Sequence, residues 1–367
     1  MDNPAAILFL GKRSPYGLSV ARCLLESGPN LRRVLVPTKE AWERLARLNG
    51  SMRTPQPSSM ISRAVRAARR AFTHGAPAAP PGGEPVIAWE PDAGITAKAL
   101  LDDCERRGIP WQAVDRIRSR ALRREIAALR PDLLLSASCP FIFDEDLLDL
   151  PRLGSINFHP SLLPRCRGCH PIYWTLASGE ASGGVTAHFM SREVDAGDIV
   201  AQIELPLSDR DDYASLYRRC MKASPELVAR VVRFVRSGAV SGVRQDGARA
   251  TFFNEDTEED HRIDWSRADA ARIAARVRAG QAFTTWRGER LGILRARPHP
   301  DGGAPAQPGL VKGFDGSSLL VACAGSTVAL ESLAWRSMRY EPQDLCAAIG
   351  IGKGTTLENS MDVETIP

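Results

Sequence analysis

Residues 154–174 read G-S-I-N-F-H-P-S-L-L-P-R-C-R-G-C-H-P-I-Y-W, and the first of them alternate between apolar and polar side chains. Alternate side chains of a β-strand lie on the same face of its sheet. Ile156 and Phe158 are therefore expected to pack into a core, while Asn157 and His159 point together to the opposite side. The pairing of an amide with an imidazole is the first indication of a functional site.

Two further features belong to the same site. Pro160 follows the strand directly, and because proline lacks a backbone N–H it ends the strand. Asn157 and His159 are therefore left at the carboxyl end of the strand. The acidic turn Asp195-Ala196-Gly197-Asp198 can bring a carboxylate to the same place. An amide, an imidazole and a carboxylate together predict a site that polarises a carbonyl group and moves a proton.

The chain ahead of this strand alternates short apolar runs with helical patterns, which predicts a doubly wound α/β domain with a mostly parallel sheet over residues 1–206. Strands are expected at 5–10, 33–37, 109–114 and 132–136, and helices at 16–27, 94–107 and 119–129. Ligands of such sheets bind beyond the carboxyl ends of the strands. Lys12 and Arg13, in the turn after the first strand, are therefore candidates for contact with an anionic acceptor; a solvated surface turn is the alternative.

A basic insertion interrupts this pattern at about residues 44–83, which contain no acidic residue and many arginines. Apolar residues at helical spacing within it suggest a basic amphipathic helix, flanked by proline-rich and glycine-rich loops. The insertion could bind a polyanion or close over a site. A solvated loop is the alternative.

Beyond residue 206 the composition changes. Helices at 211–222 and 224–237 are assigned to a helical linker over 207–260, and a further helix is expected from Ser266 to Ala279. Short β-rich runs separated by glycines at 283–286, 291–296, 309–312, 318–323 and 327–333 predict a small, OB-like β-barrel domain over 261–345. The remaining residues, 346–367, have little apolar content and are expected to form a loose tail.

Composition limits the function classes. The 367 residues are 44% hydrophobic and 25% charged, with a net charge of +5, which is below what a dedicated nucleic-acid-binding domain carries. The N-terminus lacks a signal-peptide pattern and no apolar run is long enough to cross a bilayer, so a cytoplasmic location with eight reduced cysteines is expected. The C-x-x-C-H match at 166–170 lacks the context of haem or redox sites and the second ligand pair of a zinc site, so no metal is expected.

The central motifs resemble the 10-formyltetrahydrofolate-dependent formyltransferases, which have a Rossmann-like fold. The resemblance is carried by I-N-F-H-P-S-L-L-P at 156–164, R-G at 167–168, G-V-T at 184–186 and D-A-G-D-I at 195–199. It extends upstream through R-P-D-L at 130–133 and D-L-P-R-L-G at 149–154. Downstream, R-I-D-W at 262–265 and G-E-R-L at 288–291 are similar to the C-terminal domain of the methionyl-tRNA formyltransferases.

The resemblance implies that Asn157, His159 and Asp195 are catalytic. An amine would attack the formyl carbon carried on N10 of the folate and produce a tetrahedral oxyanion. Asn157 and a protonated His159 would donate hydrogen bonds to that oxygen. Asp195 would favour the imidazolium and accept the proton of the amine, directly or through water.

The resemblance also implies where the two substrates bind. The donor, 10-formyltetrahydrofolate, is expected between two loops, formed by Cys139, Pro140, Phe141 and Ile142 and by Met190, Ser191, Arg192, Glu193 and Val194. Pro140 replaces a residue that is usually small in the family, so the pterin wall is expected to differ in shape. Ser161 and Arg167 flank the expected acceptor entrance, although both fit a surface role as well.

The acceptor is less constrained by these motifs. The long insertion and Cys169-His170, which replace a compact basic loop and two small residues of the tRNA enzymes, favour a small-molecule amine such as an amino sugar nucleotide or an amino-acid-type amine. Methionyl-tRNA is the alternative acceptor. A hydrolase that passes the formyl group to water is a third reading of the same three residues.

Overall fold

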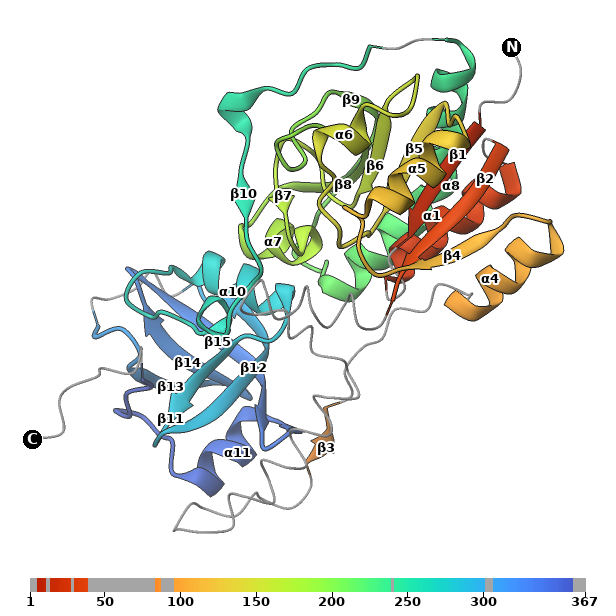
Figure 1. The fold of residues 1–367 in the computed structure, drawn as a ribbon. Coiled ribbons are helices and arrows are strands. Elements are labelled where there is room, and N and C mark those ends of the chain that lie inside the picture. Colours follow the sequence, from red (N-terminus) through yellow and green to blue (C-terminus); the bar gives the residue numbers. More distant parts are fainter. Residues whose placement is uncertain are drawn as a thin grey trace, which may run out of the picture.

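A computed structural model describes residues 5–10, 14–27, 30–38, 83–86, 96–238, 241–300 and 306–358. It contains an α/β domain and a smaller C-terminal domain built on an antiparallel sheet (Figure 1). Lys12, Arg13 and nearly all of the basic insertion lie outside the described residues. The predicted fold class is confirmed for both parts.

The α/β domain is organised around a seven-stranded sheet with the order β4-β2-β1-β5-β6-β8-β9. The strands from β4 to β6 pair in parallel, whereas β8 and β9 are antiparallel additions at the edge next to β6. The strand order reverses between β1 and β5. Ligands of this architecture bind at such a reversal, beyond the carboxyl ends of the strands. The strands are β1 (Ala5–Leu10), β2 (Asn30–Pro37), β4 (Trp111–Val114), β5 (Leu133–Ala137), β6 (Ser155–His159), β8 (Ser182–Phe189) and β9 (Ile199–Pro206).

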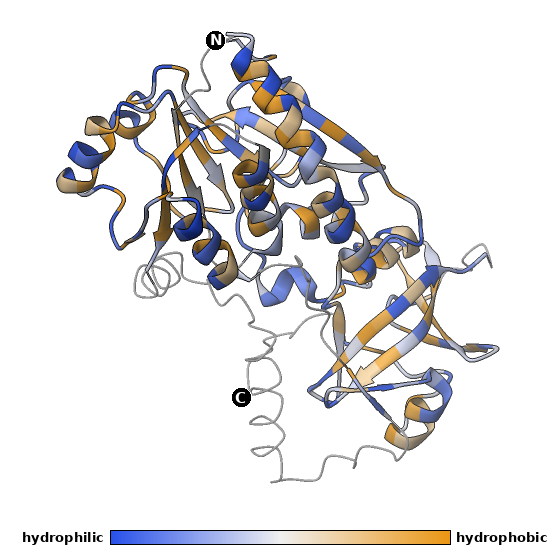
Figure 2. Cartoon of the chain, turned by 90° about the vertical axis from the view of Figure 1, so that its right-hand side faces the viewer, coloured by the Kyte–Doolittle hydropathy of each residue, from blue (hydrophilic) through white to orange (hydrophobic). Residues whose placement is uncertain are grey.

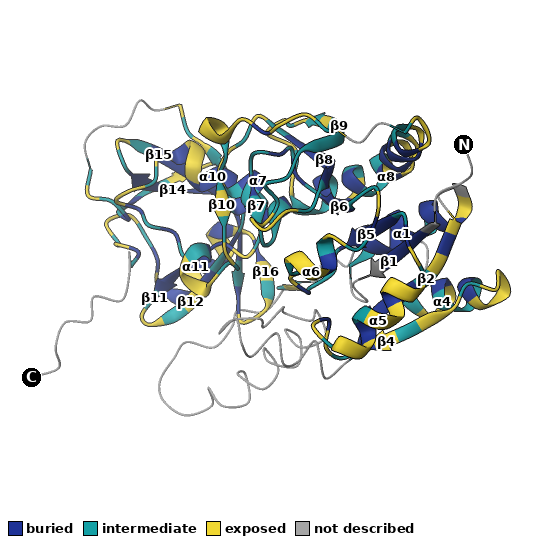
Figure 3. Ribbon diagram, turned by 45° about the horizontal axis from the view of Figure 1, so that its top comes forward, coloured by how far each residue is buried: buried dark blue, intermediate teal, exposed yellow. Residues whose placement is uncertain are grey.

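Helices cover both faces of this sheet because its central strands are apolar on both sides. Adjacent residues of β5 show this: Leu135 packs in a core with α1 (Pro15–Ser27), α4 (Ala97–Arg106) and α8 (Tyr213–Arg236), whereas Leu134 packs in a second core on the other face. The second core lies beneath α5 (Arg120–Ala128) and α6 (Glu145–Leu148). The central strands are consequently buried while the outer helices show an exposed face (Figure 3).

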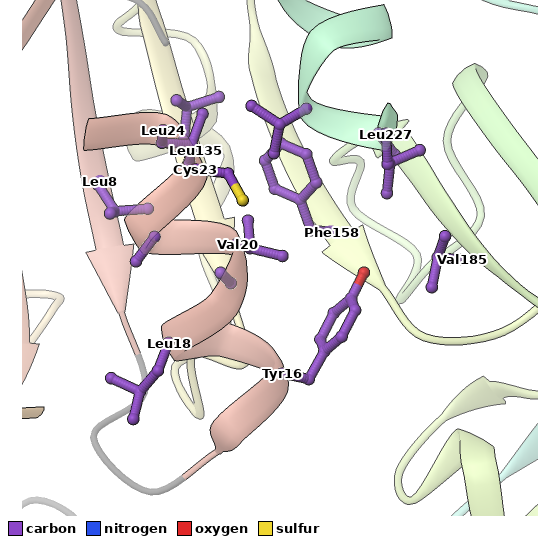
Figure 4. Packing of buried hydrophobic residues seen from close by; sticks show 14 of the residues in the cluster. Leu8, Tyr16, Leu18, Val20, Cys23, Leu24, Leu135, Phe158, Val185 and Leu227 are labelled. Atoms are coloured by element: carbon purple, nitrogen blue, oxygen red, sulfur yellow. The ribbon is translucent and has the colours of Figure 1, made fainter. Parts of the chain in front are cut away.

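Helix α8 corrects the predicted domain boundary. The two helices expected at 211–222 and 224–237 form one helix of 24 residues with Pro225 inside it. Leu227 on this helix is fully buried in the same cluster as Phe158 of the central strand and Val185 of β8 (Figure 4). The helix is therefore part of the α/β domain, and the prediction of a helical linker beginning at 207 is wrong for this segment.

The C-terminal domain contains β11 (Phe283–Trp286), β12 (Glu289–Pro298), β13 (Val311–Asp315), β14 (Ser318–Cys323), β15 (Ser326–Trp335) and β16 (Met338–Tyr340). Their alternating apolar residues, visible as bands of hydropathy in Figure 2, enclose a separate core that includes Trp265 and Trp335. Helix α10 (Ala270–Ala279) is capped at its N-terminus by Asp269, whose side chain accepts a hydrogen bond from the amide of Arg272, and it packs on this core. Helices α9 (Glu258–His261) and α11 (Pro342–Ile349) complete the domain.

The expected loose tail is wrong for residues 346–358. Residues 346–349 belong to α11, and the segment after it bridges the two edge strands through the pairs Leu310–Thr356 and Thr285–Glu358. Leu357 between them is only 1% exposed. Composition alone does not reveal that this segment is ordered, because it is held in place by backbone hydrogen bonds and one buried leucine.

Short elements join the two domains. Strands β7 (Arg167–Gly168) and β10 (Phe252–Phe253) pair in parallel, helix α7 (Pro171–Ala177) packs against α10, and the 3₁₀ helix η1 (Gly247–Arg249) precedes β10 (Figure 1). The two-residue strand β3 (Glu84–Pro85), at the end of the insertion, pairs with β16 of the C-terminal sheet. No helix in the described part of the chain combines the length and apolar character needed to cross a membrane.

We expect Leu227→Ala to lower the free energy of unfolding of the α/β domain by about 2 to 5 kcal/mol, because it empties a fully buried site in the main core. Urea denaturation of the full chain measures the effect, with the exposed Lys222→Ala on the same helix as the control. Equal, small effects of both substitutions would show that α8 is not part of this core.

Candidate active site

The central strand β6 presents its side chains as predicted. Ile156 and Phe158 are fully buried in the core on one side. On the other side, the antiparallel register with β8 places His188 opposite Asn157 and Thr186 opposite His159. The site is therefore built where the parallel part of the sheet meets its antiparallel edge.

The turn that carries Asp195 is held against the end of β8. Asp195 has a left-handed backbone, with φ of 54°. Gly197 approaches the carbonyl oxygen of Phe189 so closely that a Cβ at this position would lie 1.9 Å from it, so only glycine fits. The amide of Phe189 in turn donates to the carbonyl of Asp198, at 2.8 Å. These constraints fix the place from which the Asp195 side chain enters the site.

The structure brings the three predicted catalytic residues together. Asn157 Nδ2 donates to Asp195 Oδ1 at 3.4 Å, and His159 Nδ1 lies 3.5 Å from Asp195 Oδ2. The backbone amide of Gly168 also donates to Asp195 Oδ2, at 2.9 Å. His159 Nε2 faces the carbonyl of Cys166 at 2.9 Å, and because a carbonyl can only accept, this nitrogen carries a proton.

His188 belongs to the same cluster, although it lies in none of the motifs quoted above. Its Nδ1 donates to the carbonyl of Phe189 at 2.8 Å, which directs Nε2 into the site. There Nε2 lies 3.3 Å from both Asn157 Nδ2 and Asp195 Oδ1. The signal that could have found it is strand register: in an antiparallel pair, the residue opposite Asn157 shares its face.

Burial and charge set the protonation states of the site. Burial alone would raise the pKa of Asp195, but His159, His188 and the Gly168 amide stabilise the carboxylate and bring its pKa well below the ordinary value. Burial lowers the pKa of His159 below 6.5, and the nearby Asp195 carboxylate only partly offsets this. The resting site therefore combines an ionised Asp195 with a neutral His159. Desolvation of the ring outweighs the attraction of the carboxylate in this resting site, and the expected role of a protonated His159 during the reaction stays a prediction.

The arrangement can polarise a carbonyl group and move a proton, but it does not supply a thiolate nucleophile. Burial raises the pKa of both the Cys166 and the Cys169 thiols to about 11, so each stays protonated near neutral pH. His170, the last residue of the C-x-x-C-H match, is instead hydrogen bonded through Nδ1 to Asp256. Among the described residues, no group of three or more histidine, cysteine or acidic side chains is arranged to hold a metal ion.

The two loops expected to bind the cofactor lie next to each other. Phe141 is buried in the second core of the α/β domain, and Cys139 and Met190 pack against the same core. Ile142 and Val194 are exposed, which leaves apolar surface on both loops. The remaining predicted contacts, Pro140, Ser191, Arg192 and Glu193, are half-buried or exposed, and Arg192 Nη1 lies 3.6 Å from Glu145 at the surface. Cofactor binding by these loops stays a prediction.

Two of the predicted acceptor residues, Ser161 and Arg167, lie in different surroundings. Ser161 is fully buried and its hydroxyl donates to the carbonyl of Arg165 at 2.8 Å, so the expectation of Ser161 at an entrance is wrong. It stabilises the loop after β6 instead. Arg167 lines a pocket of about 370 Å³ together with Glu193, Val194, Ala250, Thr251 and Phe252, beside the turn that carries Asp195.

A doubly wound sheet with an amide, an imidazole and a carboxylate together at the end of a central strand is typical of an enzyme that acts at a carbonyl carbon. Comparison with known proteins narrows this class. Residues 91–232 match the formyl transferase model, and residues 257–345 match the model of the formyl transferase C-terminal domain. The chain belongs to the formyltransferase family, and the predicted formyl-transferring enzyme is confirmed.

Individual relatives agree with this membership. The chain is 39% identical to the methionyl-tRNA formyltransferase of Anaeromyxobacter sp. (strain K) over 61% of its own length and 73% of that protein. It is 28% identical to that of Bacillus licheniformis over 72% of its length and 84% of that protein. An N-formyltransferase from Helicobacter canadensis, crystallised with folinic acid and dTDP-3-aminofucose, shares the fold at 13% identity, with a TM-score of 0.55 over 93% of this chain and all of that one.

We expect the imidazole of His159 to be neutral and protonated at Nε2 at pH 7, because burial lowers its pKa below 6.5 and Nε2 donates to Cys166. Acidification should therefore protonate this ring at a lower pH than an ordinary histidine. Long-range ¹H–¹⁵N spectra measure this, with the resonances assigned by their loss in His159→Gln. Imidazolium shifts at pH 7 would contradict the expectation.

Proposed function

We propose that this protein transfers the formyl group of 10-formyltetrahydrofolate to a primary amine, and that the acceptor is methionyl-tRNA. The observation that carries the chemistry is the contact of Asn157 and His159 with the Asp195 carboxylate at the end of β6. The donor is supported by membership of the formyltransferase family and by the adjacent loops around Phe141 and Met190.

The first step is attack of the amine on the formyl carbon. A bond forms between the amine nitrogen and this carbon, and the carbonyl electron pair moves to oxygen to give a tetrahedral oxyanion. In the resting structure Asn157 Nδ2 donates to Asp195 and lies near His188. We expect one of its two N–H groups to turn toward the oxyanion when the substrates are bound. Fixed donors of this kind stabilise the charge that develops in the transition state.

The second step is proton transfer from the amine and collapse of the tetrahedral intermediate. The amine must lose a proton, and the Nδ1 lone pair of the neutral His159 can accept it, directly or through water. The imidazolium so formed is stabilised by Asp195 Oδ2, 3.5 Å away. Collapse breaks the bond between carbon and N10, and the proton passes to N10 of the departing tetrahydrofolate.

Methionyl-tRNA as the acceptor is supported by relatives that match 61% of this chain over 73% of their own length. Those that are 38% to 40% identical carry the name methionyl-tRNA formyltransferase. This support reverses the preference drawn from the sequence, which placed a small-molecule amine first. The change rests on overall similarity, because the motifs that favoured a small amine cover only a few positions.

A small-molecule amine is the second candidate, favoured by one local feature. Cys169 and His170 stand where the tRNA enzymes were expected to have two small residues, and His170 is bound to Asp256 of the segment that leads to the C-terminal domain. The pocket beside this loop, of about 370 Å³ and with Arg167 and Glu193 in a largely apolar wall, has room for a compact acceptor.

Incubation with 10-formyltetrahydrofolate and either methionyl-tRNA or a panel of amino sugar nucleotides and amino acids tests the acceptor. We expect rapid loss of the donor and N-formylmethionyl-tRNA as the product with methionyl-tRNA alone. Turnover restricted to one of the small amines would replace the first candidate by the second. Formate release at the same rate without any amine would identify a hydrolase.

The salt dependence of acceptor binding gives a further test. If tRNA binds through the basic insertion, replacing Arg63, Arg66, Arg69 and Arg70 together by alanine should reduce the slope of log Kd against log salt by roughly one for each phosphate that the insertion no longer neutralises. The matched control replaces four exposed arginines of the α4–α5 region, Arg106, Arg116, Arg120 and Arg124. Identical slopes for wild type and both variants would contradict tRNA binding by the insertion.

A further inference from the structure

We propose that Gln245, which lies between the two regions matched by family models, is a positioning residue that holds Asp195 in its reactive place. Gln245 is only 8% exposed, although it lies in the irregular linker segment, residues 241–256. Its Nε2 donates to the carbonyl of Asp195 at 2.8 Å and to the carbonyl of Gly197 at 2.7 Å. This inference rests on the catalytic role proposed above for Asp195.

The orientation of the Gln245 amide follows from its partners. Arg167 Nε and Nη2 lie 3.1 and 2.7 Å from Oε1, and a guanidinium can only donate. The two backbone carbonyls on the other side can only accept. The amide is therefore satisfied in one orientation alone, as a bridge from Arg167 of β7 to the turn that carries Asp195.

The bridge acts on a turn that is held against β8 at Gly197 and Asp198 but has two of its carbonyls bound by Gln245. Asp195 has a left-handed backbone that non-glycine residues adopt at a cost, and its carbonyl and that of Gly197 are bound by one side-chain amide. Without this amide the two carbonyls would lose a buried partner. The turn could then relax, and the Asp195 carboxylate would move relative to Asn157 and His159.

The linker segment also positions the second support of Asp195, the amide of Gly168. The amides of Arg167 and Cys169 donate to the carbonyls of Thr251 and Phe253, at 2.9 and 3.0 Å. A Cβ on Gly168 would lie 2.1 Å from the Phe253 carbonyl, so only glycine lets the two strands approach this closely. The linker segment thus fixes both the turn and the amide that binds its carboxylate.

Two substitutions separate the functions of the Gln245 amide. Gln245→Glu keeps an oxygen for Arg167 but cannot donate to the two carbonyls, and Gln245→Met keeps the volume but removes both interactions. We expect both variants to lower kcat by roughly tenfold to a hundredfold, with a nearly unchanged KM for 10-formyltetrahydrofolate. Wild-type turnover by Gln245→Glu would overturn the proposal, because Arg167 would then be the partner that matters.

Amide hydrogen exchange supplies a measurement that needs no acceptor. If Gln245 holds Asp195, both variants should speed exchange of the Gly168 amide, which Asp195 Oδ2 protects, by about tenfold or more. Exchange at Arg167 and Cys169, whose amides bind the linker backbone, should change little. Unchanged exchange at Gly168, or equal acceleration at all three amides, would overturn the proposal.

The matched control is Asp246→Ala, the neighbouring exposed residue, whose carboxylate binds the amide of Ala248 at 3.0 Å within the linker segment. It should leave kcat and Gly168 exchange as in the wild type. Equal losses from Asp246→Ala would assign the effect to general order of the linker and contradict a specific role for Gln245. A wild type that transfers no formyl group would contradict the proposed function, while the exchange data would still decide this inference.

Discussion

The site depends on one largely buried charge, the carboxylate of Asp195, whose side chain is 10% exposed. Burying a carboxylate is unfavourable unless its oxygens are paired. Asn157 from β6, His159 from the same strand, His188 from β8 and the Gly168 amide from β7 all face it at 2.9 to 3.5 Å. The same contacts that make the charge tolerable also fix an amide and an imidazole beside it, so stabilisation and chemistry come from one arrangement.

The fold supplies these contacts from distant parts of the chain. The parallel part of the sheet presents Asn157 and His159 at a strand end, and the antiparallel β8 adds His188 opposite Asn157. The loop that contributes Gly168 is in turn paired with β10, which belongs to the connection between the domains. The C-terminal domain is therefore joined to the rest of the protein through a segment that pairs with the loop beside the reacting groups.

Local patterns in the sequence predicted much of this structure. The apolar runs of β1 and β5 and the alternation of Ile156, Asn157, Phe158 and His159 correspond to the strands and faces observed. The errors involve long-range packing: Leu227 and Leu357 are buried by distant partners, and His188 acquires its place only through strand register. The burial of His159, which lowers the pKa of its ring, could not be predicted either, because the extent of burial cannot be read from residue types.

The most direct test of this account is the turnover of Asp195→Asn, which keeps the shape of the side chain and removes its charge. With the acceptor that the wild type uses, we expect kcat to fall by about a thousandfold or more, because the imidazolium formed when His159 accepts the proton would lose its stabilising charge. Binding of 10-formyltetrahydrofolate, measured by titration, should stay close to that of the wild type. A kcat within about tenfold of the wild type would contradict the central role of this carboxylate.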